Sequence, residues 1–96
     1  MMDKRKAYEE KLDTQFKKWG AELALFSAKA DKAKAEAKVE YFKTIKTLQG
    51  KREAAGAKLQ ALKNAGDESW EDLKVGAEKA WADVRTAFHE AASRFK

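Results

Sequence analysis

The amino-acid sequence predicts an all-α protein, an antiparallel helical hairpin with a long helix over about residues 4–63 and a short helix over about residues 68–95. Three observations predict this coiled-coil-like fold. The chain has no proline, 39% of its residues are charged, and its apolar residues recur at the spacing of one helix face. Three Trp, five Phe and two Tyr argue against a disordered chain, which would be poor in aromatic residues. A chain of 96 residues forms a single domain, 1–96.

The long helix is predicted by an apolar stripe from Tyr8 to Leu62 whose steps are three or four residues and average 3.6. That average matches a nearly straight helix with little supercoiling. The alternative is a break at Gly50, because a glycine costs about 1 kcal/mol relative to alanine inside a helix and Arg52 also lies on the stripe. Between these two ends the stripe contains Leu12, Phe16, Trp19, Leu23, Phe26, Ala30, Ala33, Ala37, Tyr41, Ile45, Leu48, Arg52, Ala55 and Leu59.

A turn is predicted at "KNAGDESWED". Asn64 and Gly66 favour a left-handed helix end, and either Asp67 or Ser69 is suited to be the N-cap of the next helix. The short turn makes the two helices antiparallel neighbours. We expect a hairpin core of Ile45, Leu48, Leu59, Leu62, Trp70, Leu73, Trp81, Val84 and Phe88.

The N-terminal half of the long helix has no predicted partner in its own chain. At 1.5 Å per residue, the short helix folded back from Gly66 reaches only to about residue 40. An exposed apolar stripe of this size marks an interaction site, since burying each large side chain contributes about 1.5–3 kcal/mol. We therefore expect a homo-oligomer, a dimer or tetramer forming a helical bundle, with "AKADKAKAEAK" as its narrow centre. The residues predicted for self-association are Leu12, Phe16, Trp19, Leu23 and Phe26.

The sequence offers no candidate for catalysis, for metal binding or for cofactor binding. His89 is the only histidine, and a Glu-x-x-His metal motif would need an acidic residue where Thr86 stands. There is no cysteine, and the five glycines are isolated, so no phosphate-binding loop is recognisable. We expect a protein that is not an enzyme and has no cofactor, no metal and no small-molecule substrate.

The charge pattern leaves two other partners to consider. The net charge of +5 suits nucleic acid, but acidic residues interrupt nearly every basic run, so we expect no specific nucleic-acid binding and at most a weak nonspecific one. A membrane surface is the main alternative, in which Phe16, Trp19 and Phe26 with their neighbouring lysines lie in the lipid interface and the chain folds fully only when bound. The charged N-terminus and the lack of a long apolar run predict a cytoplasmic protein.

Three segments, "KRKAYEEKLDTQFKKW", "AKADKAKAEAKVEYFKTIKTLQ" and "ESWEDLKVGAEKAWADVRTAFHEAASRF", resemble a family of small bacterial coiled-coil domain-containing or stress-response proteins. The resemblance spans nearly the whole chain. It is carried by the Tyr41–Phe42 pair, by the Gly66–Asp67 turn and by the series Trp70, Trp81 and Phe88. It implies a soluble bacterial protein with no known catalytic activity, raised under stress, and it transfers no site residues. We therefore predict a structural or interaction protein, in which Trp19→Asp dissociates the oligomer and spares the hairpin.

Overall fold

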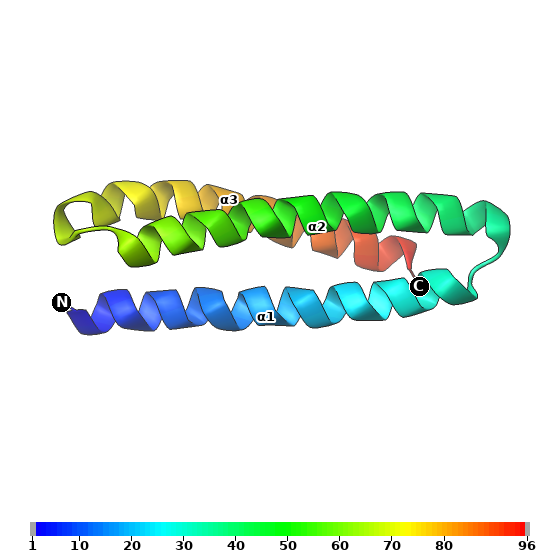
Figure 1. Cartoon of the computed structure of the whole chain (residues 1–96), viewed down its shortest axis with the longest axis horizontal. Coiled ribbons are helices and arrows are strands. Elements are labelled where there is room, and N and C mark those ends of the chain that lie inside the picture. Colours follow the sequence, from blue (N-terminus) through cyan, green and yellow to red (C-terminus); the bar gives the residue numbers. More distant parts are fainter. Residues whose placement is uncertain (1, 96) are drawn as a thin grey trace.

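The computed structural model describes the backbone of residues 2–95 and the side chains of residues 4–95. This part of the chain forms three helices, α1 (Met2–Lys32), α2 (Ala35–Asn64) and α3 (Asp67–Arg94). They pack lengthwise in an elongated bundle of 51 × 18 × 17 Å, in which α2 runs antiparallel to both α1 and α3 (Figure 1). The predicted all-α fold with antiparallel helical packing is confirmed.

The predicted long helix over residues 4–63 is wrong in its continuity, because the chain reverses at Ala33 and Lys34. Lys34 is extended (φ −64°, ψ 151°), and its carbonyl accepts the first bond of the next helix from the Lys38 amide at 2.8 Å. The alternative break at Gly50 is wrong too, since Gly50 lies inside α2. The predicted narrow centre of a coiled coil is therefore a turn between two helices.

The position of the reversal follows from where the large apolar residues stand. Between Phe26 and Tyr41 the stripe carries only alanines, so the chain can turn there without removing a large side chain from the core. The turn lays aromatic rings of α1 against those of α3 and of Phe95, which follows it. Each large apolar side chain buried in this way contributes about 1.5–3 kcal/mol.

Aromatic rings form the contact between α1 and α3. Near the middle of the bundle Trp19 stacks on Phe88 with ring centroids 5.7 Å apart and lies 5.3 Å from Trp81. Further along, Phe26 stacks on Phe95 at 4.6 Å, and Tyr41 of α2 packs on the same ring at 4.6 Å. Such ring pairs add about 0.5–1.5 kcal/mol each beyond the area that they bury.

The second turn lies where the sequence predicted it, but its geometry differs. Ala65 and Gly66 are both extended, and no residue of the described backbone has a positive φ, so the predicted left-handed helix end is wrong. The N-cap of α3 is Gly66, without a side-chain capping bond, in place of Asp67 or Ser69. Eight of the nine predicted core residues are buried, and the exception is Leu73, which is 36% exposed.

Candidate functional site

The residues predicted for self-association lie in the core of the chain's own bundle. Four of them, Leu12, Trp19, Leu23 and Phe26, are no more than 7% exposed, and Phe16 is half-buried. The premise that this half of the stripe has no intrachain partner is wrong, because α2 and α3 cover it. A contact surface for a partner must therefore be sought on the outside of the bundle.

Phe16 lies at the edge of the core beneath an arginine from α2. The guanidinium carbon of Arg52 is 3.8 Å from the Phe16 ring centroid, and Arg52 Nε donates to the Phe16 carbonyl at 3.0 Å. Two glycines make room for this contact. A Cβ on Gly20 would lie 2.8 Å from Arg52 Nη2, and a Cβ on Gly56 would lie 3.0 Å from the Phe16 ring. The sequence signal was an arginine on an apolar stripe with glycines nearby, which our interpretation treated as a weakness of the helix.

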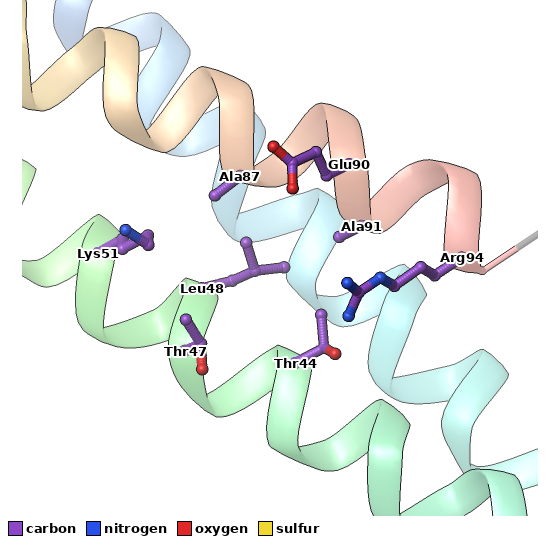
Figure 2. Close-up of a pocket in the computed structure, with 8 residues that line it drawn as sticks. All are labelled: Thr44, Thr47, Leu48, Lys51, Ala87, Glu90, Ala91 and Arg94. Atoms are coloured by element: carbon purple, nitrogen blue, oxygen red, sulfur yellow. The ribbon is translucent and has the colours of Figure 1, made fainter.

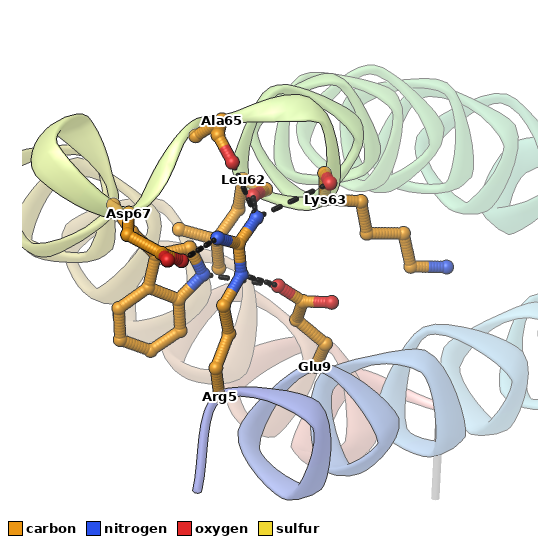
Figure 3. A network of polar contacts seen from close by, with 7 residues as sticks. Arg5, Glu9, Leu62, Lys63, Ala65 and Asp67 are labelled. Carbon is orange, nitrogen blue, oxygen red and sulfur yellow. Dashed lines mark hydrogen bonds and ion pairs between the residues drawn. The ribbon is translucent and has the colours of Figure 1, made fainter. Parts of the chain in front are cut away.

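A second arginine closes the end of the bundle where the N-terminus meets the α2–α3 turn (Figure 3). Arg5 Nη2 donates to the Ala65 carbonyl at 2.6 Å, and Trp70 Nε1 donates to the Glu9 carboxylate at 2.9 Å. The Arg5 guanidinium thus caps the C-terminal end of α2, where carbonyls lack helical partners and the helix dipole is negative. Its remaining contacts are to Glu9, Asp67, Leu62 and Lys63. All of these polar groups hold the fold together.

A groove of about 190 Å³ lies between α2 and α3 (Figure 2). The hydroxyls of Thr44 and Thr47 are already used, since each donates to a carbonyl one turn earlier in α2. Lys51 Nζ is paired with Asp83 at 2.8 Å. The groove is smaller than a ligand pocket of about 300–1,000 Å³. Its lining residues are Thr44, Thr47, Leu48, Lys51, Ala87, Glu90, Ala91 and Arg94.

A second cavity, with a larger volume of about 320 Å³, lies between α1 and α3. Its lining includes Tyr8, Gln15, Glu78 and Trp81. The Tyr8 hydroxyl donates to the Glu78 carboxylate at 3.4 Å. Burial raises the pKa of Tyr8, and the negative charge and hydrogen bond of Glu78 raise it further. Trp81 Nε1 is buried without a hydrogen-bond partner. The raised pKa keeps the Tyr8 phenol neutral, so it is not an activated nucleophile, and we assign this cavity no reaction.

The remaining chemistry-bearing residues stand apart from one another. His89 is exposed on α3. Within the described residues no three His, Cys, Asp or Glu side chains are grouped so that they could hold a metal ion. None of the described helices has the length and apolar character needed to cross a bilayer.

The outer face of α2, defined by Val39, Phe42, Lys43 and Lys46, is the most distinctive exposed surface. These residues stand at positions i, i+3, i+4 and i+7 and therefore share one side of the helix. Val39 is 61% exposed and Phe42 is 41% exposed, although Ile45 on the same helix is buried. Our sequence interpretation recorded Phe42 only as half of an aromatic pair. The signal that it missed was this second apolar row.

Comparisons of the chain with protein-family models, with curated proteins and with solved structures found no match. The described residues define the chain by its fold as an antiparallel three-helix bundle. The resemblance to the bacterial coiled-coil family stays a prediction.

Proposed function

We propose that the chain is a non-enzymatic interaction protein that acts as a self-contained, folded three-helix bundle. The observation that supports this proposal is the burial of Leu12, Trp19, Leu23 and Phe26 by the chain's own α2 and α3. A stripe that is covered within the chain needs neither a second copy nor a lipid surface in order to fold. The bundle therefore meets its partner already folded and contacts it through its exterior.

Two features support a rigid unit. Cations of α1 cap the C-terminal ends of both other helices, since Arg5 binds carbonyls at the end of α2 and Lys29 Nζ donates to the Phe95 carbonyl at 3.2 Å. Aromatic contacts then join α1 to α3 from Tyr8–Trp70 at one end to Phe26–Phe95 at the other. A bundle 51 Å long that is fastened along its length suits a spacer or an adaptor.

We also propose a link to a stress response, and this part of the proposal rests on the sequence resemblance alone. Homo-oligomerisation also stays a proposal. It would use the outside of the bundle rather than Leu12, Phe16, Trp19, Leu23 and Phe26.

The test is light scattering after size exclusion, with helicity and urea unfolding measured on the same samples from low to high micromolar concentration. We expect full helicity and one cooperative unfolding transition whose midpoint does not depend on concentration. A half-helical chain at low concentration that gains helix on self-association or on adding lipid would overturn the proposal. A constant mass equal to a multiple of 10.8 kDa with unchanged helicity would place the association on the outside of the folded bundle.

A further inference from the structure

We propose that the outer face of α2 docks the bundle on an anionic lipid surface. This inference deepens the proposed function and rests on it, because it names the partner that the folded bundle meets. Val39 and Phe42 would enter the interface between headgroups and acyl chains, and Lys43 and Lys46 would lie against lipid phosphates or carboxylates.

The apolar part of the face is not explained by the fold. Ile45 and Leu48 of α2 are buried in the core, whereas Val39 and Phe42 stay exposed, so the helix carries apolar residues that the bundle does not use. Val39 and Phe42 are one turn apart and form a continuous patch. The other large exposed apolar residues do not form such a pair, because Leu25 stands alone on α1 and Leu73 and Val75, two positions apart, lie on different sides of α3.

The charge around this face is complementary to an anionic surface. Residues 34–46, from the turn into the first part of α2, contain four lysines and two acidic residues. Among the described side chains none of these lysines forms an ion pair, and the ion pairs of the bundle lie elsewhere. Glu40 stands on the neighbouring row of α2, which leads to Thr44 and the α3 groove, whereas the exposed Glu36, three residues before Val39, lies at the edge of the outer face. The outer face is therefore apolar and, with Lys43 and Lys46 against Glu36, net basic.

Lipid suits this combination better than nucleic acid does. In nucleic-acid binding, cations contact phosphates and aromatic rings stack on bases. Neither contact uses an exposed aliphatic side chain such as Val39. A lipid interface takes aliphatic and aromatic side chains together with flanking lysines.

The proposed docking is weak and reversible, since only two apolar side chains insert. From Val39 to Lys46 the face is about 10 Å long at 1.5 Å per residue, so α2 lies along the surface and the bundle stays intact.

The experiment is co-sedimentation of the full chain with phosphatidylcholine vesicles, with and without a quarter of phosphatidylserine. We expect binding only to the anionic vesicles, weakened by salt. Lys43→Ala/Lys46→Ala should weaken it about 25-fold, at about fivefold per lysine near an anionic surface. Val39→Ser/Phe42→Ser should weaken it about tenfold or more, because the apolar insertion is lost while the charge is unchanged.

Matched controls use the rest of the bundle. Lys17→Ala/Lys18→Ala removes the same charge from exposed positions of α1, and Val75→Ser removes a 56% exposed valine from α3. Both should bind within about threefold of the unmodified chain, since long-range attraction falls off within a Debye length. Helicity and the unfolding midpoint should be unchanged in all four variants.

Besides a failure to bind anionic vesicles, four results would overturn the inference. The first two are equal binding to vesicles with and without phosphatidylserine, and a loss of vesicle binding in Lys17→Ala/Lys18→Ala as large as that in Lys43→Ala/Lys46→Ala. The other two are binding to a DNA duplex that is as tight as binding to vesicles and depends on the same outer-face residues, and a lower mass of Val39→Ser/Phe42→Ser than of the unmodified chain in light scattering. The last two would assign the face to nucleic acid or to a second copy. If the bundle is folded alone but does not bind vesicles, only this inference fails, whereas a bundle that is unfolded alone refutes the proposed function.

Discussion

The guanidinium of Arg52 lies 3.8 Å above the ring of Phe16 and donates from Nε to the backbone carbonyl of the same residue. One side chain of α2 thus makes a cation–π contact and a hydrogen bond with a single residue of α1. This explains why an arginine occupies an apolar stripe: its head group leaves the core and crosses to the neighbouring helix. The contact depends on Gly20, whose missing side chain leaves the space that Arg52 Nη2 fills.

We expect the effect of Gly20→Ala on the free energy of unfolding to depend on Arg52. With Arg52→Ala in place, the alanine should stabilise the chain by about 1 kcal/mol through helix propensity. In the native background the methyl group displaces the guanidinium, so the gain should shrink or reverse, with a coupling of about 1 kcal/mol in a double-mutant cycle. Urea unfolding measures all four chains. Gly50→Ala is the control, because its Cβ meets no atom within 4 Å and should act equally in both backgrounds. An equal effect of Gly20→Ala in both backgrounds would contradict the contact.

Trp19→Asp should unfold all three helices, in contrast to the sequence-based prediction that it spares the hairpin. Trp19 is buried between Trp81 and Phe88, so the change removes a large ring and places a carboxylate in the core. Loss of the ring alone costs about 3–5 kcal/mol, a large part of the stability of a small domain. Circular dichroism is the measurement. Leu25→Asp, at a position that is 61% exposed on the same helix, should keep native helicity. A helical Trp19→Asp chain with a reduced mass would restore the original prediction.

Arg5→Ala should destabilise the bundle by about 2–3 kcal/mol, because charge-assisted bonds to the end of α2 and to Asp67 are lost together. Arg5→Lys should recover only part of this, since an ammonium group cannot reproduce the fork of a guanidinium. Lys29→Ala, which removes one bond to the Phe95 carbonyl, should cost about 1 kcal/mol. Urea unfolding gives the energies, and amide hydrogen exchange should show faster opening of the last turn of α2. An Arg5→Ala loss no larger than that of Lys29→Ala would argue against the capping role.

Tyr8 should titrate above its ordinary pKa of 10.0, because burial and the Glu78 carboxylate both favour the neutral phenol. A pKa raised in the folded state makes a contribution to stability that is complete below pH 10.0 and is lost as the pH rises through the folded pKa. Ultraviolet titration in a Tyr41→Phe background isolates Tyr8. Glu78→Gln should lower the midpoint while leaving it above 10.0, since burial is the larger cause. A midpoint at 10.0 in the Glu78-containing chain would contradict the contact.

Trp70→Phe should cost about 1 kcal/mol more than Trp81→Phe in free energy of unfolding. Both rings are buried, but Trp70 Nε1 donates to Glu9 and Trp81 Nε1 has no partner. Removing a paired donor leaves Glu9 without its bond, whereas removing an unpaired buried donor relieves a cost. Urea unfolding compares the two variants directly. The opposite order would mean that Trp81 Nε1 is satisfied in solution.

Local signals were enough to predict the helical class, the turn near Gly66, the extent of the last helix and most of the core. The stripe of α2 and that of α3 each have a 3.6 period, and the residues on them are buried or half-buried with the exception of Leu73, which is 36% exposed. The caps were not predictable in this way. Arg5 and Lys29 act on helix ends that are distant in the sequence, and no local pattern marks them as caps.

The sequence by itself determined that the chain is helical and that one apolar stripe runs from Tyr8 to Leu62. Only the tertiary structure decided that this stripe folds back on itself at Ala33 and Lys34. Alanine and lysine are good helix formers, so local propensity favours continuation through that segment. Reversal leaves the ends of two helices exposed to water. In return, it buries Trp19 and Phe26 against the aromatic rings of α3, and this gain exists only once all three helices are in place.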